Sequence, residues 1–322
     1  MERKKIWKKI LLLLAISNIL SMTNSNFSYN INSNLTSTIK SSDEINFLAT
    51  ADIHAGYPQS VSDKTISVLA KYLPENNNRG VIISGDLTGY VKYTGNLFSY
   101  KLMLASISNH LLAGFGNHDS DTTCKVNQTW LNQNIVKQNA MTAAHLLYYT
   151  SKNEVPVYSW NWLGIHFVQC SLAPINKDTS GWNFGRSDPG PALTELQKDL
   201  EINVGLSNMP IVLAFHYGYD DFSIDQEWWS KEQRTEFENE ILAKYNVILM
   251  LTGHQHFVST KYDEKIIAVN VGKKTIYDVL SGTALFGGYS EISINKTNKE
   301  ITIKHHNVQQ NDEIVINKKI KY

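Results

Sequence analysis

The feature that most constrains this chain is a series of short apolar runs, each followed within two residues by glycine, aspartate or histidine. The run that leads into Gly116-Asn117-His118-Asp119 is the clearest example. The runs occupy residues 45–51, 81–84, 111–115, 211–215 and 247–251. Apolar runs of this length, closed by turn-forming residues, predict buried β-strands that end in loops. In open α/β sheets ligands bind at the carboxyl ends of strands, so the pattern also indicates a functional edge.

The segments between these runs carry helical patterns. Ser62 precedes apolar residues at a 3.6-residue period, and residues 97–107 form a second helical stretch. Ser230 and Gln233 occupy the two positions of a capping box, which predicts a helix that reaches about Tyr245. This alternation of strand and helix predicts an α/β fold with a mostly parallel sheet covered by helices.

Two further regions have the pattern of β-hairpins. Residues 155–162 and 165–170 are strand-like runs joined by a short turn. Residues 290–294 and 301–304 alternate apolar and polar residues, which predicts an antiparallel hairpin with one solvated face. We interpret this second hairpin as part of a second sheet.

The N-terminal residues differ from the rest in composition. Residues 1–9 carry five basic side chains, and residues 10–22 are mainly apolar. This is typical of a secretory signal peptide, so we expect residues 1–23 to be removed and the protein to be secreted. The apolar stretch is shorter than the ~20 residues of a membrane-spanning helix, although an uncleaved signal anchor is the alternative. Residues 24–44 are rich in Asn, Ser and Thr and predict a disordered leader, and residues 45–322 favour a single domain.

Charge and cysteine content bound the partners and the redox chemistry. The formal net charge is zero and no basic stripe is present, so we expect no nucleic-acid partner. We also expect no stable membrane span once the signal peptide is cleaved. The two cysteines, Cys124 and Cys170, are compatible with either a disulfide or two buried free thiols.

Histidine and carboxylate residues gather at the predicted strand ends, and cysteine does not. The ends read Asp52-x-His54, Gly85-Asp86, Gly116-Asn117-His118-Asp119, His216 and Gly253-His254-x-His256. Imidazole and carboxylate donors together suit divalent first-row metals such as Zn, Mn, Fe or Ni. Two ions need about eight protein ligand positions, so one carboxylate must be shared. A shared carboxylate would hold the ions ~3.5–4 Å apart, the spacing of two-metal hydrolases.

These five motifs, in this order, resemble those of the calcineurin-like metallophosphoesterase superfamily. The resemblance covers roughly residues 45–288, and the ordered set is specific although any single motif is weak. It implies a four-layer α/β fold in which two packed mixed β-sheets are flanked by helices. It also implies an enzyme that uses two divalent metal ions to hydrolyse phosphoric ester bonds.

The resemblance implies a role for each motif. The implied ligands are Asp52, His54 and His256 for one ion, Asn117, His216 and His254 for the other, and Asp86 as the bridge. His118 is the implied proton donor, and Asp119 is a candidate to orient it. Two cations stabilise charge on phosphoryl oxygens and lower the pKa of a shared water, whose hydroxide attacks phosphorus in line. A histidine with a pKa near neutrality is the natural proton donor to the departing alkoxide.

Residues beyond the five motifs give weaker indications. Tyr217, Tyr219 and Asp220 follow His216 and are expected to line the substrate pocket. Trp228-Trp229 belongs either to the core or to a wall on which the substrate stacks. The other five histidines match no motif and are expected to be surface or satisfied core residues: His110, His145, His166, His305 and His306.

The residues after Asp86 fit neither of two well-marked branches of the superfamily. Protein serine/threonine phosphatases have Arg-Gly there, and purple acid phosphatases have a metal-binding Tyr three residues on, whereas Tyr90 is four residues on here. A secreted phosphomonoesterase or phosphodiesterase that acts on small or lipid-linked phosphates therefore fits best. A nucleic-acid nuclease of the same superfamily and a non-catalytic binding member are the alternatives. The missing basic stripe argues against the first, and the complete ligand set argues against the second.

Overall fold

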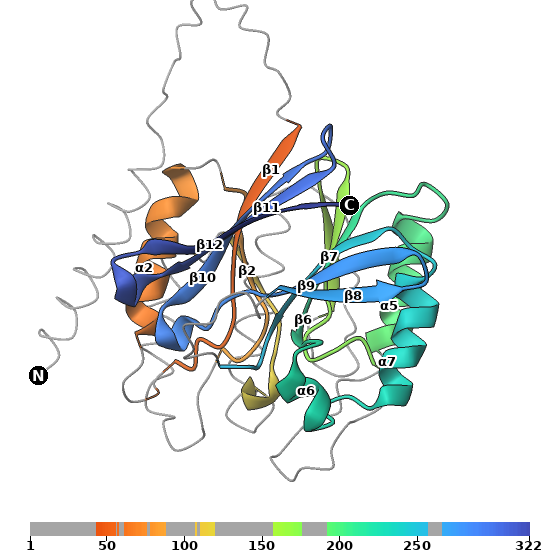
Figure 1. Ribbon diagram of the computed structural model, residues 1–322, viewed down its shortest axis with the longest axis horizontal. Helices are drawn as coiled ribbons and strands as arrows, with labels where there is room; N and C mark the ends of the chain where they lie inside the picture. Colours follow the sequence, from red (N-terminus) through yellow and green to blue (C-terminus); the bar gives the residue numbers. More distant parts are fainter. Residues whose placement is uncertain are drawn as a thin grey trace, which may run out of the picture. The chain divides into compact units, whose positions relative to one another are not determined.

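The strands of the described residues form two six-stranded β-sheets in the computed structural model of this chain (Figure 1). The structure describes residues 43–55, 57, 61–75, 78–87, 107, 110–119, 157–175, 192–256 and 266–322. The first sheet has the order β12-β11-β10-β1-β2-β3, with bounds β1 Glu44–Thr50, β2 Val81–Ile83, β3 Leu111–Ala113, β10 Gly288–Asn295, β11 Glu300–Asn307 and β12 Glu313–Lys321. The second has the order β4-β5-β6-β7-β9-β8, with bounds β4 Tyr158–Trp162, β5 Ile165–Gln169, β6 Ile211–Tyr217, β7 Val247–Gly253, β8 Ile266–Val271 and β9 Lys274–Leu280.

Both sheets are mixed. In the first sheet β1, β2 and β3 are parallel, and β10 pairs antiparallel with β1. In the second sheet β5, β6, β7 and β9 are parallel, and β4 and β8 are antiparallel edge strands. All five strands predicted to end in polar motifs are present, and within each sheet they run in the same direction. Their carboxyl ends therefore lie at one edge of each sheet.

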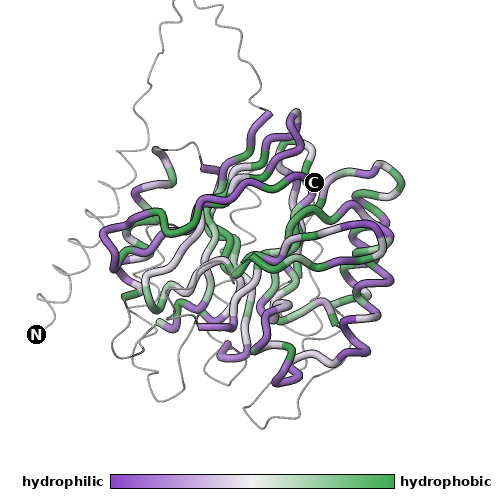
Figure 2. Tube along the Cα trace, viewed as in Figure 1, coloured by the Kyte–Doolittle hydropathy of each residue, from purple (hydrophilic) through white to green (hydrophobic). Residues whose placement is uncertain are grey.

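Helices cover the outer face of each sheet and complete the four layers (Figure 1). The helical segments are α2 Ser62–Glu75, α5 Ala192–Asn203, α6 Asp221–Asp225, α7 Lys231–Phe237, the π-helical turn η4 Glu238–Leu242, and the 3-10 turns η3 Asn117–Asp119, η6 Ala284–Phe286 and η7 Val308–Gln310. Helix α2 packs on β1, β2 and β3, and helices α5 and α7 pack on the second sheet. Figure 2 shows hydrophilic residues along the outer side of α5 and hydrophobic residues along the central strands. The predicted capping box is confirmed, because the Ser230 hydroxyl accepts the Gln233 N–H and the Gln233 side chain accepts the Ser230 N–H.

The main core lies between the two sheets. Side chains alternate along β1, so Ile45, Phe47 and Ala49 face the second sheet while Leu48 faces α2. Phe47 packs edge-on against Phe167 of β5, with ring centroids 5.5 Å apart. Burial of each such large apolar side chain stabilises the fold by roughly 1.5–3 kcal/mol.

The prediction that residues 290–294 and 301–304 belong to a second sheet is wrong. They form the predicted hairpin, but β10 pairs with β1 from Glu44↔Asn295 to Ala49↔Ser290, so the hairpin widens the first sheet. The apolar face of the hairpin, with Ile292 and Ile301, joins the same core layer as Phe47. An alternating pattern defines which face of a strand is buried, but it does not define which sheet edge the strand joins.

Strand β6 also extends further than predicted. It continues through His216 to Tyr217, because the N–H groups of both residues donate to the Leu172 carbonyl and Tyr217 pairs with Gly253. None of the helices among the described residues is long and apolar enough to cross a membrane. Several sequence predictions lie outside the described residues: the signal peptide and leader, most of the helix at 97–107, Tyr90, and Cys124.

Candidate metal centre

The five predicted motifs meet where the carboxyl ends of the two sheets adjoin. The loop after β2 is hydrogen-bonded to both central strands of the second sheet. The Ser84 carbonyl accepts from His216 Nδ1 at 2.7 Å, and the Ser84 hydroxyl donates to the Leu251 carbonyl at 3.0 Å. The structure thus brings together side chains that are up to 204 residues apart in the chain, from Asp52 to His256.

One cluster consists of Asp52, His54, Asp86 and His256. The Nε2 atoms of His54 and His256 are 2.8 Å apart. His256 Nε2 lies 3.2 Å from Asp52 Oδ1, and His54 Nε2 lies 3.5 Å from Asp86 Oδ2. One ligand atom from each residue lies within 4.8 Å of the others.

A second cluster consists of Asp86, His216 and His254, with Asn117 beside it. His216 Nε2 lies 3.3 Å from Asp86 Oδ2 and 3.1 Å from Asn117 Oδ1. Asp86 is common to both clusters. Its Oδ2 atom faces the imidazole nitrogens of His54 and His216, one from each cluster.

The donor atoms of both clusters fit divalent metal ions. Within the described part of the chain, Asp86 Oδ2 and His254 Nε2 are buried without a hydrogen-bond partner. Leaving such polar atoms buried and unpaired costs about 1–3 kcal/mol each. Ligands bound at about 2.1 Å in tetrahedral geometry lie about 3.4 Å apart, which matches the 3.2–3.5 Å spacings between several of the donor atoms. The donor set of imidazole, carboxylate and amide oxygen suits Zn, Mn, Fe or Ni.

The backbone around these residues is strained. Four of the candidate ligands have left-handed backbone conformations, with φ of 52° for Asp52, 44° for His54, 53° for Asp86 and 70° for His254. Such conformations cost on the order of 1–3 kcal/mol each and cluster at functional sites. They direct neighbouring side chains of one loop to a common point.

Gly116 is required by the close approach of two motifs. A Cβ atom at this position would lie 2.2 Å from Asp86 Oδ1 and 2.5 Å from the Asp86 backbone nitrogen. Both contacts are far below van der Waals separation. The glycine therefore lets the loop after β3 lie directly against the carboxylate shared by both clusters.

Backbone hydrogen bonds interlock the motifs. Asp86 Oδ1 accepts the N–H of His118 at 2.9 Å, and Asp52 accepts the N–H of His254 at 3.2 Å. Asp119 accepts the N–H groups of Gly116 at 2.8 Å and Leu87 at 3.0 Å. The carboxylate of Asp119 thus joins the loops after β2 and β3, and its suggested effect on His118 stays a prediction.

His118 lies beside the two clusters. Its Nε2 atom is 3.9 Å from Asp86 Oδ2, and its ring packs edge-on against His54 at a centroid distance of 4.9 Å. Its side chain is 19% exposed, compared with 3% for His54 and 0% for His216. The imidazole therefore reaches both the clusters and the solvent.

Burial and mutual charge set the protonation states. Burial lowers the pKa of His54 to about 4 and that of His254 well below its usual range. Burial acts to raise the pKa of Asp86, but His216 and His118 offset it and hold that pKa well below its usual range. Burial likewise acts to lower the pKa of His216, and Asp86 offsets it and raises that pKa to about 9. Neutral His54, neutral His254 and ionised Asp86 are the forms that bind metal at neutral pH.

Aromatic rings surround His254. The rings of Trp228, Tyr217 and Phe222 lie 4.3, 4.8 and 5.1 Å from it. Phe222 is 42% exposed, whereas Trp229 is fully buried in the core. The sequence left the position of Trp228-Trp229 open. Both residues belong to the core, and Trp228 also contacts a candidate ligand.

Each of the three predicted substrate residues has a contact within the protein. Tyr217 is buried against His254. The hydroxyl of Tyr219 donates to Glu238 at 3.1 Å, and Asp220 caps α6 by accepting the Ser223 N–H at 2.8 Å. Their contact with a substrate stays a prediction.

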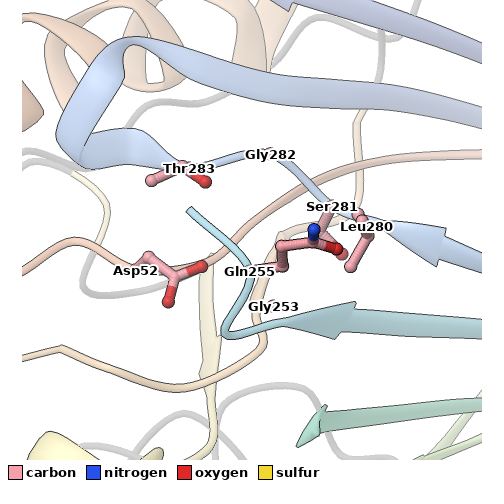
Figure 3. A pocket seen from close by; sticks show the side chains of 7 residues that line it. All are labelled: Asp52, Gly253, Gln255, Leu280, Ser281, Gly282 and Thr283. Carbon is pink, nitrogen blue, oxygen red and sulfur yellow. The ribbon is translucent and has the colours of Figure 1, made fainter. Parts of the chain in front are cut away.

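A small pocket lies behind Asp52 (Figure 3). It is lined by Asp52, Gln255 and Thr283 among others, and it encloses about 10 Å³, roughly the space of one water molecule. No role was predicted from the sequence for Phe222, Gln255 or Thr283, because a single aromatic or polar residue forms no recognisable sequence pattern.

Comparisons with known proteins agree with this geometry. A family model described as calcineurin-like phosphoesterase matches residues 45–258. A dimetal phosphatase from Danio rerio is similar in structure, with a TM-score of 0.59 and 11% identity over 86% of this chain and 99% of that one. Purple acid phosphatase PPD1 from yellow lupin has a TM-score of 0.57 and 12% identity over 86% of this chain and 54% of that one. Among curated proteins, none matches this chain.

Proposed function

This chain belongs to the calcineurin-like phosphoesterase family, and from that premise we propose that it hydrolyses phosphate mono- or diesters with two divalent metal ions. The observation that carries the proposal is the position of Asp86. Its buried Oδ2 atom has no hydrogen-bond partner among the described residues and lies 3.5 Å from His54 Nε2 and 3.3 Å from His216 Nε2. A carboxylate in this position is suited to hold one ion on each side.

Different residues are assigned to each of the two ions. Asp52, His54 and His256 would hold one ion, Asn117, His216 and His254 would hold the other, and Asp86 would contribute to both. His216 Nδ1 donates to the Ser84 carbonyl, which leaves Nε2 as the nitrogen that faces the clusters. Because the pKa of His216 is raised to about 9, an ion that binds there would displace the proton from Nε2. When bound, such ions stabilise charge on phosphoryl oxygens and lower the pKa of a nearby water. His118 donates a proton to the leaving alkoxide, and its partial exposure lets it recover that proton from solvent.

Metal analysis combined with a phosphoester panel tests the proposal. Purified protein should contain two transition ions per molecule and should hydrolyse p-nitrophenyl phosphate, its bis ester, or both. The ratio of the two rates ranks monoester against diester. At most one ion in active protein would overturn the two-ion mechanism, and cleavage of single- or double-stranded DNA without action on the small esters would favour a nuclease.

We further propose that the protein is exported and acts outside the cytoplasm on small or lipid-linked phosphoesters. The basic residues 1–9 and the apolar residues 10–22 support export. Mass spectrometry of protein from the native host should find a mature chain that begins near residue 24. A mature chain that still begins at Met1 would favour the signal anchor.

A further inference from the structure

Asp278 is a buried carboxylate of β9 that lies outside the five motifs. It is fully buried, and each of its oxygens accepts one short hydrogen bond. Oδ2 accepts the backbone N–H of Tyr219 at 2.7 Å, and Oδ1 accepts the hydroxyl of Thr252 at 2.7 Å. Its position is defined by the parallel register of β7 and β9, in which Met250 is opposite Asp278.

The two donors belong to the two segments that carry the histidines of the second cluster. Tyr219 is three residues after His216, and Thr252 is two residues before His254. One carboxylate therefore joins the end of β6 to the end of β7. The rings of the two histidines themselves lie 4.9 Å apart.

The fit around Asp278 is close. A Cβ atom on Gly218 would lie 2.7 Å from both Asp278 Oδ2 and Thr252 Oγ1. On its other side, the Gly218 carbonyl accepts the indole N–H of Trp229 at 3.2 Å. The segment after His216 is thus held between a carboxylate and a core tryptophan.

The burial of Asp278 beside Asp220 lowers the stability of the folded protein. Burial raises the pKa of Asp278 to about 7, and the nearby Asp220 adds to the shift. Asp220 itself has a raised pKa because of burial, and its Oδ2 atom is buried without a partner within the described residues. Two neighbouring carboxylates in a core are unfavourable for folding alone, and such groups are characteristic of functional sites.

We propose that Asp278 is a positioning residue for the second cluster: it sets the separation of His216 and His254 and thereby the affinity of that cluster for its ion. The inference rests on the proposed function, because it takes binding of an ion by this cluster as its premise. Partners that orient ligands in this way typically change metal affinity by about 10–100-fold.

Metal titration of wild type and six variants tests the inference. Zn²⁺ or Mn²⁺ is added to chelator-treated protein, and binding is followed by calorimetry. The variant His254→Ala identifies which of the two binding steps belongs to the second cluster. Thr252→Val removes the hydroxyl at nearly constant volume, and Asp278→Leu removes both acceptors. In both variants the metal affinity of the second cluster should fall by about 10–100-fold. The metal affinity of the first cluster, at Asp52, His54 and His256, should be unchanged.

Conservative variants separate geometry from charge. Thr252→Ser keeps the hydroxyl donor. Asp278→Asn keeps both links, because its amide oxygen can accept from Tyr219 and its NH₂ group can donate to the Thr252 oxygen. In both variants the affinity of the second binding step should be within a few-fold of the wild-type affinity. Thr275→Val is the matched control, since Thr275 is exposed on the same strand and its hydroxyl donates to exposed Asn270 at 2.9 Å.

The outcomes are distinct. A merely structural role for the Thr252–Asp278 link would lower the unfolding temperature of metal-free Thr252→Val and leave both binding steps at wild-type affinity, which would overturn the inference. Equal weakening of both steps would also overturn it. If Asp278→Leu does not fold, Thr252→Val alone decides. Wild-type protein that binds no ion would overturn the proposed function, whereas wild-type protein with two ions and an unaffected Thr252→Val would overturn this inference alone.

Discussion

Two buried histidine–carboxylate clusters in this protein differ in how completely their polar atoms are paired. In the cluster around His166, Nε2 lies 2.7 Å from Asp199 Oδ2 and Nδ1 lies 2.7 Å from Asn161 Oδ1. The other oxygen of Asp199 accepts from Ser159 at 2.6 Å and Asn203 at 2.8 Å. The atoms that face each other in this cluster are all at hydrogen-bond distance.

The candidate metal centre has the same residue types and a different spacing. Asp86 Oδ2 lies 3.3 Å from His216, 3.5 Å from His54 and 3.9 Å from His118, and it has no hydrogen-bond partner in the described structure. A histidine and a carboxylate that only stabilise the fold approach to hydrogen-bond distance, as His166 and Asp199 do. Imidazole nitrogens that converge on one carboxylate oxygen and stop beyond ordinary hydrogen-bond distance, as they do at Asp86 Oδ2, are arranged for an ion between them.

Asp86→Asn should have the largest effect. The substitution removes the charge that both clusters share, so we expect the loss of at least one ion and a fall in kcat/KM of about 10³-fold or more. Elemental analysis and steady-state kinetics measure the two effects. Asp63→Asn, at an exposed position in α2, is the matched control. Two bound ions together with wild-type turnover in Asp86→Asn would show that the shared carboxylate is not a ligand.

His118→Ala should retain both ions and still slow turnover by roughly 10²–10⁴-fold. The loss should be greatest for alkyl esters and smallest for p-nitrophenyl esters, because a good leaving group departs without a proton. Comparison of kcat across leaving groups measures this dependence. Full activity of His118→Ala on esters with poor leaving groups would rule out the proton-donor role.

Asp199→Ala should affect stability and leave metal content unchanged. Removal of one partner from a buried ion pair typically destabilises a protein by about 3–5 kcal/mol, because the other partner stays buried without it. Urea unfolding measures the loss, and Glu201→Ala, at an exposed position of the same helix, should change stability little. A loss of bound ions in Asp199→Ala would contradict the division between the two clusters.

Local sequence patterns predicted the strand ends and the motifs after them, but not the partners that come from other elements. The apolar run before Gly116 and the polar residues after it are contiguous, so both the strand and the site are evident in one segment. The link between Thr252 and Asp278 depends on the pairing of β7 with β9, which passes over β8 in the chain. The hairpin of β10 and β11 was assigned to the wrong sheet for the same reason: strand order is a property of the whole fold.

The smallest expected effect concerns Asp278, a buried carboxylate that faces no cation among the residues that the structure describes, and the dependence of its contribution to stability on pH. The pKa of Asp278 is raised to about 7, so the folded protein keeps a proton that the unfolded chain has lost above about pH 4. This contribution therefore destabilises the folded state as pH rises towards 7, and it is absent at lower pH, where both states are protonated. Asp278→Asn cannot ionise, and relative to wild type it should gain about 2 kcal/mol of stability between pH 5 and pH 7.

Urea unfolding of metal-free wild type and Asp278→Asn at pH 5, 6 and 7 measures this gain. Metal must be absent, because ion binding would stabilise the two proteins to different degrees. Asp220 is the nearby carboxylate that acts on Asp278, so Asp220→Asn should give part of the same gain. The helix cap is kept in this variant, because the Asn side-chain oxygen can also accept the Ser223 N–H. A difference between wild type and Asp278→Asn that stays constant over this pH range would mean that Asp278 is ionised throughout and that its two hydrogen bonds fully compensate its burial.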